Sequence, residues 1–196
     1  MPARCLKLIE KIEEHIRESV KTKEKMLALS GEIASAASLL ISAIERKNKI
    51  LIFGNGGSAA DAQHIAAELV GRFEKDHHPL PALALTTNTS VLTSIGNDFD
   101  FNVIFSKQVE AFGREGDVAI AISTSGRSPN VLEAVRTAKR LGLATIGLSG
   151  KDGGPMRDLV DICLTVPSER TARIQEGHVL IAHILCKLVE EASVPA

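Results

Sequence analysis

The sequence predicts an α/β fold in which helices flank a doubly wound, five-stranded, mainly parallel sheet, with an N-terminal helical extension. Two observations support this fold class. Five short apolar runs are continuous rather than alternating, as in strands buried on both faces of a parallel sheet; they lie at 50–53, 82–85, 118–122, 144–148 and 162–166. Helical stretches separate or follow these runs, at about 58–70, 101–112, 130–141 and 173–192. Such alternation of strands and helices is typical of doubly wound folds.

Residues 1–48 predict two helices ahead of the first strand. Their apolar side chains recur at spacings of three and four, and Ser30-Gly31 interrupts the pattern; they are Leu6, Ile9, Ile12, Ile16 and Val20, then Ile33, Ala37, Leu40, Ile41 and Ile44. These helices are expected either to cover the sheet or to present an apolar face to a partner subunit. Residues 49–192 form the predicted α/β sandwich, and without a linker or repeat the whole chain, 1–196, is expected to be one domain.

The composition excludes several classes of protein. Lys and Arg number 23 against 24 Asp and Glu, so the basic excess of a nucleic-acid-binding protein is missing. The chain has no Trp and no Tyr, so a small ligand is expected to be held by hydrogen bonds and charge rather than by stacking. Cys5, Cys163 and Cys186 form no CxxC pair, which suits reduced thiols and a cytoplasmic location. No uninterrupted apolar run reaches the roughly 18–20 residues of a membrane span, so no membrane partner is expected.

Two loops at strand ends have the chemistry of an anion site. Asn55, Gly56, Gly57 and Ser58 follow the first strand and begin a helix, where small residues and free N–H groups favour phosphate. Gly54-x-Gly56-x-x-Ala59 also resembles a dinucleotide fingerprint. However, Thr86-Thr87-Asn88 stands where an acidic ribose ligand is expected, which argues against a nicotinamide cofactor.

The second loop follows the third strand and is rich in hydroxyl groups. Its side chains either cap the next helix or surround a phosphate monoester; they are Ser123, Thr124, Ser125 and Ser128. Because ligands of doubly wound folds lie beyond the carboxyl ends of the strands, two such loops together favour an anionic ligand.

Two helices contain side chains suited to proton transfer or metal binding. His64 and Glu68 are four residues apart and share a helix face, as a surface pair, a metal half-site or an acid/base pair would. His183 lies in an apolar run, which is compatible with either a buried core histidine or a site residue. Gln175 lies eight residues before it, which places the two about 80° apart around the helix and roughly 12 Å apart along it. His77-His78 is interpreted as a pair of solvated loop residues.

Four segments resemble a known family. Gly54–Glu68, Thr86–Asp98, Ser123–Ser128 and Thr171–Glu176 resemble the sugar isomerase (SIS) fold, a flavodoxin-like architecture, and within it the phosphoheptose isomerases. The resemblance implies that His64, Glu68, Gln175 and His183 bind Zn²⁺ and that Glu68 and His183 are the catalytic acid/base pair. It also implies that the substrate contacts Asn97 and Asp98, which otherwise read as a turn and a helix cap, together with Glu68, Gln175 and the two loops.

The implied reaction converts sedoheptulose 7-phosphate into D-glycero-D-manno-heptose 7-phosphate through an enediol, in bacterial heptose biosynthesis that supplies lipopolysaccharide or another surface glycan. The separation of Gln175 from His183 requires long side chains, an irregular helix start or ligands from different subunits. The resemblance implies a cytoplasmic homotetramer with composite active sites. The alternative is a non-catalytic SIS-fold protein that associates with a replication initiator. The six Phe residues are expected to pack beneath or beside the site and to avoid the substrate.

Overall fold

A computed structural model describes residues 3–193 of the chain, so the ends of the expected domain, 1–2 and 194–196, lie outside the described residues. Within this range five strands form one sheet in the order β2-β1-β3-β4-β5, and every neighbouring pair is parallel. The strands are β1 (Ile50–Gly54), β2 (Ala82–Ala84), β3 (Val118–Ile122), β4 (Ala144–Gly150) and β5 (Ile162–Val166). The predicted α/β class is confirmed, because each continuous apolar run contains a strand of this central sheet.

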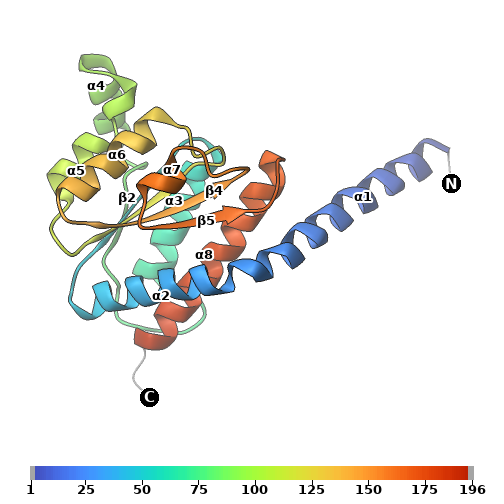
Figure 1. The fold of residues 1–196 in the computed structure, drawn as a ribbon, viewed down its shortest axis with the longest axis horizontal. Coiled ribbons are helices and arrows are strands. Elements are labelled where there is room, and N and C mark those ends of the chain that lie inside the picture. Colours follow the sequence, from blue (N-terminus) through green and yellow to red (C-terminus); the bar gives the residue numbers. More distant parts are fainter. Residues whose placement is uncertain (1–2, 194–196) are drawn as a thin grey trace.

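Helices cover both faces of the sheet. Figure 1 shows α5 (Ser106–Phe112) and α6 (Pro129–Arg140) on one face, and α2 (Ser30–Glu45) and α8 (Thr171–Ser193) on the other. Along β1, Ile50 and Ile52 pack into the core with α2, α8 and α3 (Gly57–Val70), whereas Leu51 and Phe53 pack into the core with α5 and α6. Alternate side chains of one strand therefore enter two separate cores, which is why the run had to be apolar throughout.

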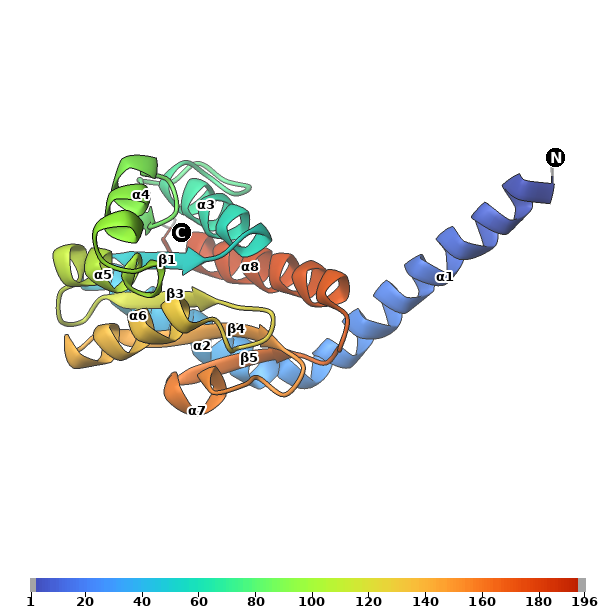
Figure 2. The same ribbon diagram turned by 90° about the horizontal axis from the view of Figure 1, so that it is seen from above.

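The N-terminal helix α1 (Ala3–Lys25) extends away from the body of the protein (Figures 1 and 2). A short 3₁₀ segment, η1 (Met26–Leu29), joins it to α2, so the helical interruption falls just before the predicted Ser30-Gly31. Five large apolar side chains of α1 are at least 50% exposed: Leu6, Leu8, Ile12, Ile16 and Val20. The sheet-covering role thus belongs to α2, and the apolar side chains of α1 have almost no cover within residues 3–193.

The helical stretch Arg4–Glu45 is long and apolar enough to cross a membrane by length and composition alone, a test that core helices also pass. Its apolar second half is α2, whose buried side chains pack in the core beneath the sheet; they are Ile33, Ala36, Ala37, Leu40 and Ala43. Packing within the protein therefore accounts for the apolar character of that half.

Four short helical elements depart from the predicted pattern. The predicted helix 101–112 is divided into η2 (Phe101–Val103) and α5, while α4 (Thr89–Asp98) and α7 (Met156–Leu159) did not appear in the sequence pattern. Helix α4 has no fully buried residue, and only Leu92 and Ile95 pack partly against the core, so its apolar stripe is too short for periodicity to detect. Its start is instead held by the Asn88 side chain, which accepts a hydrogen bond from the backbone N–H of Val91 at 3.1 Å.

Candidate active site and metal centre

The strand order places the two anion loops next to each other. In a sheet of order 2-1-3-4-5 the winding direction changes between β1 and β3, and ligands bind beyond the carboxyl ends of those strands. The loops at 54–58 and 123–128 follow these two strands. The Asn55 side chain of the first loop forms two reciprocal amide hydrogen bonds, of 2.8 and 2.9 Å, with the Asn130 side chain in the first turn of α6, just after the second loop. The sequence therefore identified two loops that form one local surface.

Glycine is required in the hydroxyl-rich loop. Gly126 has a φ of +62°, and a Cβ at this position would overlap the carbonyl oxygen of Gly153. The side chains of Ser123 and Ser128 lie within hydrogen-bond distance of each other, at 3.0 Å, and the Ser125 hydroxyl accepts a 3.3 Å hydrogen bond from the N–H of Arg127. The turn thus gathers several hydroxyl groups at the end of β3, next to the start of α6.

The predicted metal ligand Gln175 lies at the first loop. A Cβ on Gly57 would overlap the side-chain amide of Gln175, so this side chain lies directly against the first turn of α3. Ser58, in the same turn of α3, is buried. A cavity of about 140 Å³ lies beside this loop, and its lining includes Asn55, Thr86 and Phe105. Gln175 is therefore placed with the anion loops.

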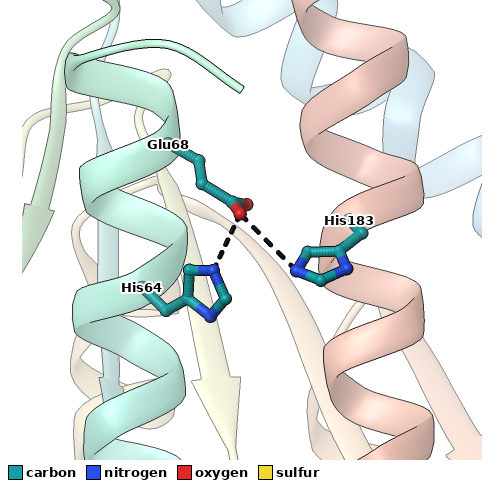
Figure 3. A group of neighbouring side chains, drawn as sticks. All are labelled: His64, Glu68 and His183. Atoms are coloured by element: carbon teal, nitrogen blue, oxygen red, sulfur yellow. Dashed lines mark ion pairs between the residues drawn. The ribbon is translucent and has the colours of Figure 1, made fainter. Parts of the chain in front are cut away.

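The other three predicted metal ligands meet farther along the same two helices (Figure 3). Nε2 of His64 lies 2.8 Å from Oε1 of Glu68, and Nε2 of His183 lies 3.5 Å from the same oxygen. One ligand atom from each residue falls within a group no more than 4.8 Å across. The side chain of Glu68 is only 12% exposed, against 49% for His64 and 39% for His183, so the carboxylate forms the floor of an open site.

This donor set fits a divalent metal ion. Two imidazole nitrogens and a carboxylate oxygen are a ligand combination typical of zinc sites that keep a position open for substrate. Oε2 of Glu68 is buried and has no hydrogen-bond partner among the residues that the structure describes. A buried carboxylate oxygen without a partner is costly, and a bound cation would remove that cost.

Three further side chains lie near the cluster of His64, Glu68 and His183; they are Phe73, Asp61 and Cys186. The ring of Phe73 lies 5.5 Å from that of His183, centroid to centroid, and the ring of His64 lies 5.2 Å from it in an edge-on arrangement. Burial raises the pKa of Asp61, one turn before His64, while the nearby imidazole acts to lower it. Burial and the adjacent Glu68 carboxylate raise the pKa of the Cys186 thiol, so this thiol stays protonated beside the site.

Other predicted site residues lie outside both groups. Asn97 and Asp98 end α4, where the Asn97 amide donates a 2.8 Å hydrogen bond to the Asp98 carboxylate. Both residues are exposed, whereas Thr124, which belongs to the hydroxyl-rich loop itself, is half-buried. The Arg72 side chain, one turn after Glu68, forms an exposed ion pair with Asp76.

The Phe residues divide into two groups. The rings of Phe53 and Phe105 stack in the core beneath the first loop, with centroids 5.6 Å apart. Three others are exposed: Phe99, Phe101 and Phe112. Phe101 nevertheless lines the cavity beside the first loop, and Phe73 lies beside His183. Packing beneath or beside the site is therefore not shown for Phe99 and Phe112, and avoidance of the substrate stays a prediction.

The sequence interpretation of His77 was wrong. Its side chain is 1% exposed and faces Glu190, another side chain that is 1% exposed. His178 is also fully buried, and one ring nitrogen lies 2.9 Å from the carbonyl oxygen of Ser149. Glu190 could have been noticed as an acid seven residues after His183, on the apolar face of α8 that also buries Cys186. The burial of His77 has no signal in the local sequence.

Comparisons with known proteins identify the family of the chain. Residues 9–150 match the SIS domain family. The chain is 53% identical over 186 residues to the phosphoheptose isomerase of Nitratiruptor sp., covering 94% of this chain and 100% of that protein. It is 56% identical over 179 residues to the phosphoheptose isomerase of Geobacter sulfurreducens, covering 91% of this chain and 94% of that protein.

Solved structures show the same relationship. The phosphoheptose isomerase from Neisseria gonorrhoeae superposes with a TM-score of 0.90 at 46% identity, over 94% of this chain and 99% of that chain. The phosphoheptose isomerase from Francisella tularensis also gives 0.90, at 41% identity, over 93% of this chain and 98% of that chain. Together, the fold and the relatives show that this chain belongs to the phosphoheptose isomerase family of SIS-domain proteins.

Proposed function

We propose that this protein converts sedoheptulose 7-phosphate into D-glycero-D-manno-heptose 7-phosphate. The observation that supports this most directly is the approach of Glu68 and His183 from two different helices, near the anion loops. His64 follows Gly57 by seven residues of helix, so the cluster lies roughly 10 Å from the loops along α3. An extended seven-carbon sugar with a terminal phosphate spans a comparable length, with its carbonyl end at the cluster.

The reaction moves hydrogen between two neighbouring carbons. A proton leaves C1 and the C2 carbonyl oxygen accepts a proton, which gives the enediol; the O1 proton then leaves and C2 is protonated. Glu68 is assigned the proton transfers at carbon because its carboxylate is the least exposed group of the cluster. His183 is assigned the transfers at O1 and O2, since an imidazole both donates and accepts protons near neutral pH. The loop hydroxyls and N–H groups hold the phosphate.

We propose Zn²⁺ as the bound ion, with His64, Glu68 and His183 as ligands and Gln175 as the fourth. A zinc ion polarises a substrate carbonyl and favours the developing negative charge on its oxygen. The unpartnered Oε2 of Glu68 and the two imidazoles support the first three ligands. The position of Gln175 against Gly57 supports a composite site, in which Gln175 approaches the ion only after assembly or a change of its side-chain conformation.

We further propose that the whole chain acts as one domain in a cytoplasmic homotetramer, in the heptose pathway of a bacterial surface glycan. The exposed apolar side chains of α1 support assembly, because such a surface on an extended helix is unfavourable in water. Ile16→Glu is expected to reduce the molar mass measured by light scattering, whereas Arg17→Glu is the matched change at a neighbouring polar position. An unchanged mass for Ile16→Glu would remove α1 from the proposed interface.

The deciding experiment follows sedoheptulose 7-phosphate by NMR with the purified protein, before and after treatment with a chelator. Formation of the aldose, its loss on chelation and its recovery with zinc are the expected results. Glu68→Gln should abolish turnover and leave substrate binding largely intact, while Gln63→Ala, an exposed position on the same helix, should behave as the wild type. Absence of product from folded, zinc-supplied protein would favour a non-catalytic role. The relatives give no support to the replication-initiator alternative.

A further inference from the structure

Glu190, near the end of α8, binds the backbone of a distant loop. Its Oε1 accepts hydrogen bonds from the N–H groups of Phe73 and Glu74, at 2.9 and 3.0 Å, and its Oε2 accepts from Glu74 at 3.2 Å. Nε2 of His77 lies 3.7 Å from Oε1. A second link from α8 to this loop is the exposed ion pair between Lys187 and Glu74, whereas Glu190 is the buried anchor that binds the loop backbone.

A buried carboxylate needs hydrogen-bond partners in fixed positions, so Glu190 requires the loop backbone to stay where it is. Burial acts to raise the pKa of Glu190, but hydrogen bonds from Lys75, Phe73 and Glu74 and the nearby His77 outweigh it and hold the pKa below its ordinary value. The carboxylate therefore stays ionised while it is 1% exposed. Nδ1 of His77 lies 2.7 Å from the carbonyl oxygen of His78, and a carbonyl only accepts, so Nδ1 bears the hydrogen.

The loop that Glu190 binds also contacts the candidate active site. The N–H of Phe73 is bound to Glu190, while the ring of the same residue lies 5.5 Å from the His183 ring at an interplanar angle of 35°. On another side, His183 meets the ring of His64 at 76°. A shift of the loop would therefore move one of the two rings between which the His183 imidazole is packed.

We infer that Glu190 is a positioning residue for His183, which acts through the loop backbone and the ring of Phe73. The inference rests on the proposed function for its kinetic consequence. Glu190 does not touch the reacting atoms. It holds Phe73 against the imidazole and so limits the orientations of His183 from which a proton can be transferred.

The test compares Glu190→Gln with Glu191→Gln, a matched change at an exposed neighbour. Glutamine keeps the size of the side chain and an acceptor oxygen but removes the charge. At a temperature well below both melting transitions, Glu190→Gln should lower kcat roughly 10-fold with KM nearly unchanged. Glu191→Gln should match the wild type. A Glu190→Gln enzyme with wild-type kcat would overturn the inference, whatever its melting temperature.

A double-mutant cycle tests the route. If Glu190 acts through Phe73, Phe73→Leu should lower kcat by a similar factor, and the double variant should be no slower than the slower single variant. If the kcat losses of the two single variants multiply in the double variant, the two residues act independently and Glu190 does not act through Phe73. If Glu190→Gln does not fold, His77→Gln is tested in its place, and the same loss of kcat with nearly unchanged KM is expected.

A spectroscopic readout separates this inference from the isomerase assignment. The ring-proton resonances of His183, identified from their loss in His183→Gln, should shift in Glu190→Gln and in Phe73→Leu but not in Glu191→Gln. If the wild type does not turn over sedoheptulose 7-phosphate, the proposed function fails while these shifts still test the positioning. Unchanged His183 resonances in Glu190→Gln would overturn the inference that Glu190 positions His183.

Discussion

The buried His178 should make the folded state sensitive to mild acid. One ring nitrogen donates to the carbonyl of Ser149, and Nδ1 is buried without a partner among the described residues. Burial lowers the pKa of His178 from 6.5 to about 4, against the opposing effect of the Ser149 carbonyl. Protonation would therefore place a charge and an unsatisfied N–H inside the protein.

The sign and size of the effect follow from linkage. Between pH 4 and 6.5 the unfolded chain binds more protons at this residue than the folded protein does. The contribution of the neutral His178 side chain to the free energy of unfolding is therefore fully present above about pH 6.5 and is lost as the pH falls toward about 4. The full shift corresponds to about 3 kcal/mol, of which about 2 kcal/mol is lost between pH 7 and 5.

The assay is urea unfolding followed by circular dichroism, since a chain without Trp or Tyr offers no useful intrinsic fluorescence. Chelated protein at one fixed concentration is measured at pH 7 and pH 5. His178→Gln keeps a donor for the Ser149 carbonyl but cannot be protonated, so it should lose about 2 kcal/mol less than the wild type. His78→Gln, at an exposed histidine, should keep the wild-type dependence. Equal losses in the wild type and His178→Gln would refute the reasoning.

Three further predictions concern the anion loops, the ion pair between Lys49 and Asp117 at the amino ends of β1 and β3, and the metal. Gly57→Ala should raise the KM for sugar phosphate several-fold because its Cβ displaces Gln175, whereas Gly31→Ala, with open space around it, should have no effect in the same assay. Burial would raise the pKa of Asp117, but Lys49 lowers it on balance, so this pair stabilises the fold above about pH 4 and not in acid. Asp117→Asn should thus cost about 2 kcal/mol in urea unfolding at pH 7, and the cost should decrease as the pH falls below about 4. Adding Zn²⁺ to chelated protein should raise its melting temperature, since the ligand atoms meet only in the folded state; no rise would argue against zinc.

Much of the fold could be predicted because it depends on local pattern. The apolar run at 118–122 coincides with β3, and the predicted helix 58–70 differs from α3 by one residue. Helix α4 was not predicted, since only two of its side chains pack partly against the core and its start depends on one side-chain cap. The boundary of α1 and α2 also shifted, because η1 continues the helical path across Met26–Leu29.

The candidate site could be predicted only in part. The spacing of His64 and Glu68 places them on one face of α3, and family resemblance added His183. The contact between Glu68 and His183 joins residues 115 positions apart, and it exists because α3 and α8 pack side by side on the same face of the sheet. The burial of His77 against Glu190 depends on the same packing.

The sequence by itself determined the fold class, the glycine-rich and hydroxyl-rich chemistry of the two loops and the shared helix face of His64 and Glu68, because strand periodicity, helix spacing and loop chemistry are local properties. The proposed acid/base pair came instead from the family resemblance. Only the tertiary structure decided which of these residues meet. It brought Glu68 and His183 together, left Gln175 with the first loop, exposed the apolar face of α1 and placed Glu190 behind the active-site loop. These outcomes depend on how helices pack across the sheet, and packing is settled by the shapes of surfaces that are distant in sequence.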